Sequence, residues 1–211
     1  MPEEADFTDE ALSVSGRIRV KMRNNPLFRR GSMESICVNR KNFEIVKLLG
    51  KGKGGYSFLV TDGSRQYVLK QIHHEPCTYY RFGNKMEAEM NDYDRLQKIG
   101  IRIPLLLDTD IGQERILKEF IDGDTVYDLV ENDRMRPEYL DQVREMCGLL
   151  YPADTNIDYF PTNFVVRDGL IFYIDYECNH YMAEWNFENW GVKYWSKTEE
   201  FLAYAREHRA Q

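Results

Sequence analysis

Two carboxylates and a carboxamide in the second half of the chain have the types and spacing of a magnesium–phosphate site. Asp158 and Asn163 flank the segment Tyr-Phe-Pro-Thr, and Asp175 follows two apolar runs, 164–166 and 170–174. An Asp-Gly turn signal joins these runs, so they are predicted to form a hairpin. Because a hairpin brings its outer ends together, we expect Asn163 and Asp175 to lie side by side. Mg²⁺ prefers such oxygen ligands, and phosphoryl transfer also requires a base such as Asp158.

A glycine-rich turn lies upstream, between runs that resemble strands. Gly50, Gly52 and Gly55 form the pattern G-x-G-x-x-G. In a dinucleotide-binding fold a helix would begin at these glycines, but here the strand-like runs 58–60 and 67–70 follow. A glycine loop between strands exposes backbone amides that can fold over phosphates.

Lys70 ends the third strand of this unit, where its ammonium could bridge phosphate oxygens. Residues 85–99 are predicted to form a helix, because apolar residues recur there at helical spacing. Glu89 falls inside the apolar arc, whereas Glu87 projects away from it. A carboxylate on an apolar face is costly unless it is paired, so we expect an ion pair between Glu89 and Lys70. The alternatives are a solvated Lys70 and a Glu89 at the wet margin of the arc.

The order of glycine loop, strand lysine, helix glutamate and acidic segment resembles that of the protein-kinase-like superfamily. The resemblance is closest to its small atypical members: Rio-type kinases, compact bacterial and effector kinases, and aminoglycoside phosphotransferases. It covers about residues 43–177, and the segment Lys-Glu-Phe-Ile-Asp-Gly-Asp-Thr at 118–125 resembles the interlobe hinge of these enzymes. It implies an α+β bilobal fold. Residues 41–118 would form an N-lobe with a five-stranded antiparallel sheet and one main helix, and residues 119–211 a reduced, mainly helical C-lobe.

The resemblance also implies roles for the residues that could do chemistry. Asp158 would orient or deprotonate the acceptor hydroxyl. Asn163 and Asp175 would bind Mg²⁺, with Mn²⁺ as an alternative. Lys70 would contact the phosphates of ATP and so take part in catalysis.

ATP is the implied cofactor. The glycine loop would cover its phosphates, and Glu89 would hold Lys70 against them. Backbone groups of Glu119 and Ile121 would contact the adenine.

The chain departs from the family pattern in three places. Asp158 is preceded by Thr-Asn-Ile and not by a histidine motif. Asp175 is followed by Tyr176 and Glu177 in place of Phe-Gly; Tyr176 could pack as the phenylalanine does, and Glu177 is either a further metal ligand or an acid at a helix start. Lys118 takes a position where an apolar residue is usual, and would either extend to solvent or pair with an acid.

Downstream of the hinge the pattern is mainly helical. We expect a short helix at 123–131, a longer one over 139–150 and an amphipathic helix at 199–208. The aromatic-rich segment 185–195 is expected to cover the core of the C-lobe, with a peptide- or sugar-binding platform as the alternative. No Ala-Pro-Glu motif follows Asp175, so a conventional activation segment is not expected.

Composition is that of an ordinary globular protein. The chain has 211 residues, of which 43% are hydrophobic and 30% charged, and a net charge of −7. The negative charge argues against nucleic acid as a partner, and no apolar run is long enough for a membrane span. Four cysteines without paired spacing indicate reduced thiols in the cytoplasm, or in a host cytosol for an effector: Cys37, Cys77, Cys147 and Cys178.

The first 40 residues differ from the rest of the chain. An acidic start without periodicity is followed by a basic stretch at 17–30, which indicates a flexible leader. The sequence Gly-Ser-Met at 31–33 resembles a cloning junction. We therefore interpret residues 1–40 as a leader, tag or fused peptide outside the fold.

These features predict an ATP- and magnesium-dependent kinase that phosphorylates a protein substrate, with Ser/Thr preferred over Tyr. A small-molecule phosphotransferase of the aminoglycoside or choline kinase type is the closest alternative. A nucleotide-binding pseudokinase scaffold and a nucleotidyl transferase are the others.

Overall fold

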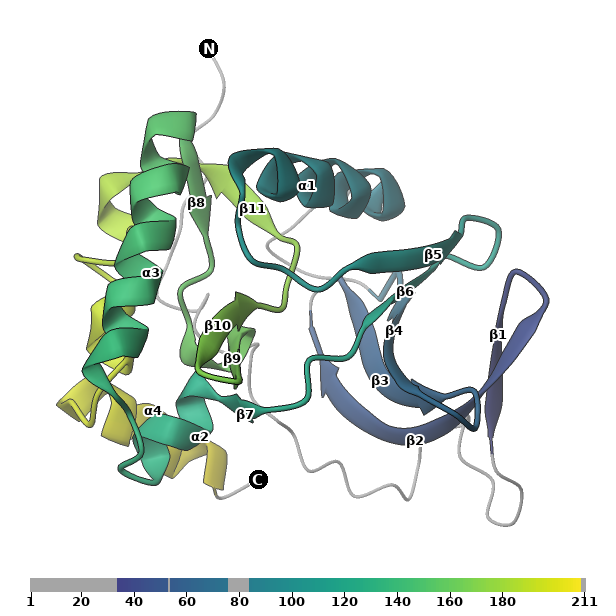
Figure 1. Ribbon diagram of the computed structural model, residues 1–211, viewed down its shortest axis with the longest axis horizontal. Coiled ribbons are helices and arrows are strands. Elements are labelled where there is room, and N and C mark those ends of the chain that lie inside the picture. Colours follow the sequence, from purple (N-terminus) through teal and green to yellow (C-terminus); the bar gives the residue numbers. More distant parts are fainter. Residues whose placement is uncertain (1–33, 53, 76–83, 210–211) are drawn as a thin grey trace.

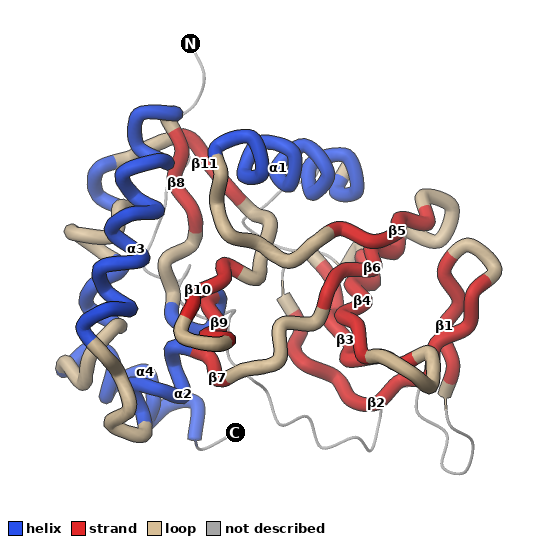
Figure 2. Tube along the Cα trace, viewed as in Figure 1, coloured by secondary structure: helices blue, strands red, loops and turns tan. Residues whose placement is uncertain are grey.

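The computed structural model describes residues 34–52, 54–75 and 84–209, and within them the chain is a mixed α+β protein. Figure 1 shows a curled sheet on one side of the molecule and most of the helices on the other. We call residues 34–119 the sheet part and residues 120–209 the helical part. Figure 2 shows the same division by secondary structure.

Six antiparallel strands form the large sheet: β1 (Ser35–Val38), β2 (Lys41–Lys51), β3 (Gly55–Thr61), β4 (Gln66–Ile72), β5 (Leu106–Asp110) and β6 (Arg115–Glu119). Their order is β1-β2-β3-β4-β6-β5. Asn39, in the turn after β1, reaches the opposite edge: its backbone N–H donates to Asp110 Oδ2 at 3.0 Å and its Nδ2 to Asp108 Oδ1 at 2.8 Å. These bonds hold the sheet in its curl around a small apolar cluster of Val38, Phe43, Phe58, Val60, Leu69 and Leu117.

The expected count of five strands was wrong by one, because β1 pairs with β2. The turn between them, Asn39-Arg40, has φ values of 45° and 70°. Two successive residues with positive φ match the twist of a tight hairpin, and asparagine tolerates this conformation well. Val38 is fully buried, so residues 34–40 belong to the sheet and not to the predicted leader. Residues 1–33, with the proposed junction, lie outside the described residues.

Helix α1 (Lys85–Ile99) has the bounds predicted from its periodicity. Asn84 caps its start by accepting a hydrogen bond from Glu87 N, and Gly100 ends it in the left-handed conformation with φ 92°. Tyr93 packs with residues of the sheet part, whereas Leu96 belongs to the core of the helical part. The helix therefore contacts both parts, and Figure 1 shows it lying between them.

The helical part contains three further α-helices, a three-stranded sheet and a two-stranded one among its described residues. The predicted hairpin is present as β9 and β10, joined by Asp168 and Gly169, which both have positive φ. The elements are β7 (Asp124–Thr125), α2 (Val126–Glu131), α3 (Pro137–Leu150), β8 (Thr155–Ile157), β9 (Phe164–Arg167), β10 (Leu170–Tyr173), β11 (Cys178–His180) and α4 (Glu199–Arg209).

The aromatic-rich segment contributes to the main core, as expected. Phe187 and Trp195 are each 1% exposed, and Trp195 Nε1 donates to Tyr159 O at 2.8 Å. Trp195 also packs edge to face on Phe164, the first residue of β9. The segment thereby supports the hairpin that carries the candidate site residues.

No helix in the described part of the chain combines the length and the apolar character that crossing a bilayer requires.

Candidate functional site

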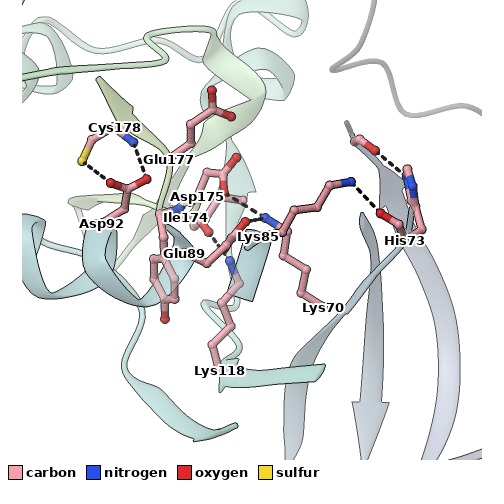
Figure 3. A network of polar contacts seen from close by, with 12 residues as sticks. Lys70, His73, Lys85, Glu89, Asp92, Lys118, Ile174, Asp175, Glu177 and Cys178 are labelled. Carbon is pink, nitrogen blue, oxygen red and sulfur yellow. Dashed lines mark hydrogen bonds and ion pairs between the residues drawn. The ribbon is translucent and has the colours of Figure 1, made fainter. Parts of the chain in front are cut away.

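Lys70 of β4 lies between two carboxylates that come from distant parts of the chain. Its Nζ forms the expected ion pair with Glu89 of α1 and lies 3.6 Å from Asp175 Oδ1 (Figure 3). The side chains of Lys70 and Glu89 are 11% and 13% exposed, whereas that of Asp175 is 32% exposed. A sheet strand, a helix and the segment after β10 thus meet at one ammonium group.

The charges of this group stabilise one another. Burial disfavours the ammonium of Lys70, but Glu89 and Asp175 outweigh that effect and raise its pKa above the ordinary value. Burial likewise disfavours the charge of Asp175, but Lys70, Lys118 and two backbone amides lower the pKa of its carboxyl. One of those amides, Tyr176 N, donates to Asp175 Oδ1 at 2.8 Å. Lys70 and Asp175 are therefore both charged at neutral pH.

The glycine loop lies against this ion pair. A Cβ added at Gly54 would stand 3.7 Å from both Lys70 Nζ and Glu89 Oε1. A Cβ at Gly55 would stand 2.5 Å from Gln71 O, so the close pairing of β3 with β4 requires glycine there. Gly50 and Gly52 have open space around the position of a Cβ, and their expected role rests on the sequence pattern. Gly54, which the pattern did not single out, is in contact distance of the ion pair.

Asn163 lies beside the segment of Asp175, as the hairpin predicted. Ile174 N donates to Asn163 O at 2.8 Å, and Asn163 Nδ2 donates to Asp158 O at 3.4 Å. Asp158 itself follows β8, and its Oδ1 accepts a hydrogen bond from Phe160 N at 3.0 Å. Hydrogen bonds thus link Asn163 to Asp158 through its side chain and to Ile174, the residue before Asp175, through its backbone.

The donor set suits a metal ion that arrives with phosphates. Among the described residues no group of three or more His, Cys, Asp or Glu side chains is arranged to hold a metal by itself. Mg²⁺ in nucleotide sites is commonly bound through one or two carboxylates together with phosphate oxygens and water. Asp175 and Asn163 have one carboxylate and one amide oxygen between them, a donor set of the chemical kind that such an ion takes.

Glu119, at the end of β6, links the sheet part to the helical part. Its Oε1 forms an ion pair with Arg167 Nη1 of β9 at 2.8 Å, and its Oε2 accepts a hydrogen bond from Leu105 N at 3.3 Å. Its amide donates to Leu105 O at 2.9 Å. Because the amide of Glu119 already has an acceptor, the carbonyl is the backbone group of this residue that we expect to contact adenine. Ile121, two residues on, is buried against Val165 of β9.

Lys118 is buried, so its ammonium does not extend to solvent, and among the described residues it forms no ion pair with an acid. Its side chain crosses toward the segment after β10, where Nζ donates to Ile174 O at 2.7 Å and lies 4.5 Å from the ring centre of Tyr176. Burial lowers the pKa of Lys118. The sequence predicts that this side chain reaches solvent or an acid, whereas its ammonium binds a backbone carbonyl.

A second link between α1 and the Asp175 segment was not predicted. The backbone N and the Sγ of Cys178 both donate to the carboxylate of Asp92, at 3.4 and 3.2 Å. Burial raises the pKa of Asp92, and it raises the pKa of the Cys178 thiol to about 12. Asp92 lies one helical turn from Glu89, which is the only signal that the sequence carried for this contact.

Glu177 is exposed and precedes the strand β11. No helix begins at this residue, so its interpretation as an acid at a helix start was wrong. Its alternative role as a metal ligand stays a prediction.

A comparison with protein-family models finds no match to this chain, and a comparison with curated proteins finds no significant match. The residues of the site and their geometry are therefore the basis for inferring function.

Proposed function

We propose that this protein is an ATP- and magnesium-dependent kinase that transfers the γ-phosphate to a hydroxyl of a protein substrate, with serine or threonine preferred. The carrying observation is the buried ammonium of Lys70, held between Glu89 and Asp175 beside Gly54. Phosphoryl transfer needs little covalent chemistry from the protein, because positioning and charge stabilisation supply most of the catalysis. A fixed cation beside a glycine loop provides both.

Lys70 would bind phosphate oxygens of ATP from below, while the amides of the glycine loop approach them from above. Glu89 is well placed to hold the ammonium, since its own carboxylate is largely buried. Its Oε2 is buried and has no hydrogen-bond partner among the described residues, which leaves acceptor capacity inside the site. A buried unsatisfied oxygen commonly marks a group whose partner comes with a ligand or water.

Asp175 and Asn163 would hold Mg²⁺, which neutralises charge on the phosphates when it is bound. Asp158 would orient the acceptor hydroxyl and take up its proton. The hydrogen bond from Phe160 N fixes one carboxylate oxygen of Asp158.

The proposed fold is the bilobal protein-kinase-like fold. The sheet part with α1 would be the N-lobe, extended by β1 beyond the expected range 41–118. The helical part would be a reduced C-lobe within 119–211. Adenine would lie between them, in contact with the carbonyl of Glu119 and the backbone of Ile121.

The test is incubation of the purified protein with a protein extract and with ATP labelled at either the α- or the γ-phosphate. We expect the γ-label, and not the α-label, to appear on protein. Asp158→Asn and Asp175→Asn should each lower this labelling by about 100-fold or more, because proton transfer and charge stabilisation are typically worth that much. Asp168→Asn is the matched control: Asp168 is exposed in the β9–β10 turn, and asparagine accepts its positive φ.

Each alternative gives a different result in this assay. Transfer of the α-label would indicate nucleotidyl transfer. Label on metabolites alone would indicate a small-molecule phosphotransferase. ATP binding without any transfer would indicate a scaffold, and equal labelling by wild type and both site variants would remove the assignment of the site.

A further inference from the structure

Lys118 reaches from the sheet part into the backbone of the Asp175 segment. It lies on β6 and is 5% exposed, so its ammonium is withdrawn from water. Its Nζ donates to Ile174 O, the carbonyl directly before Asp175. Figure 3 shows the side chain pointing at this carbonyl from the side opposite Glu177. The contact therefore acts on the backbone that carries the predicted metal ligand.

Tyr176, directly after Asp175, is held from three sides. Its ring lies under the ammonium of Lys118 and packs at 4.9 Å between centroids on Tyr93 of α1. Its hydroxyl donates to Pro104 O at 2.9 Å. Only 1% of the side chain is exposed. The residues on both sides of Asp175 are thus fixed, one through its carbonyl and the other through its ring.

Burying the ammonium of Lys118 between β6 and the Asp175 segment costs free energy. Desolvating an ammonium is costly, and apolar side chains of similar volume often replace buried charges without loss of stability. A carbonyl hydrogen bond and a cation–π contact compensate that cost in part. They do so only while Ile174 and Tyr176 keep their present arrangement, so the lysine makes that arrangement the favoured one.

We propose that Lys118 is a positioning residue: it fixes the backbone of residues 174–176 so that the carboxylate of Asp175 faces Lys70. Its importance for the reaction depends on the proposed kinase function, whereas the fixing of the backbone does not. Residues 174–176 would then keep one backbone arrangement without a bound partner. Asp175 would not have to move before ATP and Mg²⁺ bind.

Lys118→Met tests this, because methionine fills the space without a charge or a donor. Hydrogen–deuterium exchange of the peptide around residues 173–178 should become faster by about tenfold or more, the factor of one charge-assisted hydrogen bond. The melting temperature should stay the same or rise. Lys47→Met is the matched control, since Lys47 is exposed on β2 of the same sheet; its exchange should equal that of wild type.

In the kinase assay, Lys118→Met should raise the Mg²⁺ concentration for half-maximal activity by about tenfold, because a loosened Asp175 binds the ion less well. A role in stability alone would lower the melting temperature and leave this requirement unchanged, which would overturn the proposal. Wild-type exchange in folded Lys118→Met would also overturn it. If Lys118→Met does not fold, Lys118→Gln keeps a donor without the charge and should show an intermediate increase in exchange. An exchange rate in Lys118→Gln equal to that of wild type would contradict the proposal.

The two proposals can fail separately. A wild-type protein that transfers no phosphate would remove the kinase function and leave the exchange measurement intact. Unchanged exchange in an active kinase would remove only the role of Lys118.

Discussion

Lys70 is a buried cation with two carboxylate partners from distant parts of the chain, and its energetics follow from that placement. Glu89 compensates its charge from the helix side and Asp175 from the side of the helical part. An ion pair of this kind adds little net stability, because desolvation offsets most of the attraction. Under the proposed kinase function, the pair would hold a cation ready for the phosphates of ATP.

Removal of one partner should therefore be more damaging than removal of both. Lys70→Met leaves Glu89 buried without its cation and should lower the free energy of unfolding by about 3–5 kcal/mol. Lys70→Met combined with Glu89→Met should recover most of that loss, since neither charge remains. Urea unfolding of the two single variants and the double variant measures the coupling.

Additive losses in that cycle would contradict the pairing of the two side chains. Glu87→Met serves as the control for Glu89→Met, because Glu87 lies on the exposed side of the same helix. It should change the stability by no more than about 0.5 kcal/mol.

At the scale of elements, the short pairing of β7 with β9 holds the chain in place where it leaves the sheet part and enters the helical part. Gly123 lies directly before β7, where the chain approaches the backbone of Val166 closely. Thr125 then caps α2 through a reciprocal pair of hydrogen bonds with Asp128. Strand, cap and helix follow one another within a few residues, so a disturbance at Gly123 reaches all of them.

A methyl group at Gly123 should disrupt this pairing. Its Cβ would stand 2.0 Å from Val166 O, so the backbone must move, and Gly123→Ala should cost about 1–3 kcal/mol of stability. Gly148→Ala is the contrasting variant, since Gly148 lies in α3 with nothing within 4 Å of the added Cβ. It should stabilise the protein by up to about 1 kcal/mol.

Thermal or urea unfolding of both glycine variants distinguishes them by sign. Equal effects of the two substitutions would show that the close approach to Val166 does not govern stability at this position.

At the scale of the whole molecule, the site draws on both parts of the protein. Lys70 comes from the sheet part and Asp175 from the helical part, while Glu89 comes from the helix that lies between them. The ion pair of Glu119 with Arg167 gives a further link across the two parts. A ligand that contacts all of these residues would stabilise the molecule as a whole.

ATP with Mg²⁺ should therefore raise the melting temperature of the proposed kinase. A ligand at 100 times its dissociation constant stabilises the folded state by about 2.7 kcal/mol. Chelation of Mg²⁺ with EDTA should remove most of the shift, and Asp175→Asn should abolish the part that depends on Mg²⁺. Thermal denaturation with and without nucleotide measures this, and an identical shift in wild type and Asp175→Asn would remove Asp175 as a metal ligand.

The sequence alone determined the local parts of this protein. The period of apolar residues predicted α1 and placed Glu89 on its buried face, and turn chemistry predicted the hairpin that joins Asn163 to the Asp175 segment. The pairing of Glu89 with Lys70 followed from the cost of an unpaired buried carboxylate. Each of these depends on neighbours in the chain or on one strong electrostatic requirement.

Only the tertiary structure decided where β1, Gly54 and Lys118 go and what Asp92 contacts. A short strand such as β1 gains its stability from the partner beside it, and a long lysine side chain can reach many acceptors. Which acceptor it reaches depends on how two distant segments pack, because burial and hydrogen bonding are settled jointly by all the groups that meet there. That joint choice is not encoded in the spacing of residues along the chain.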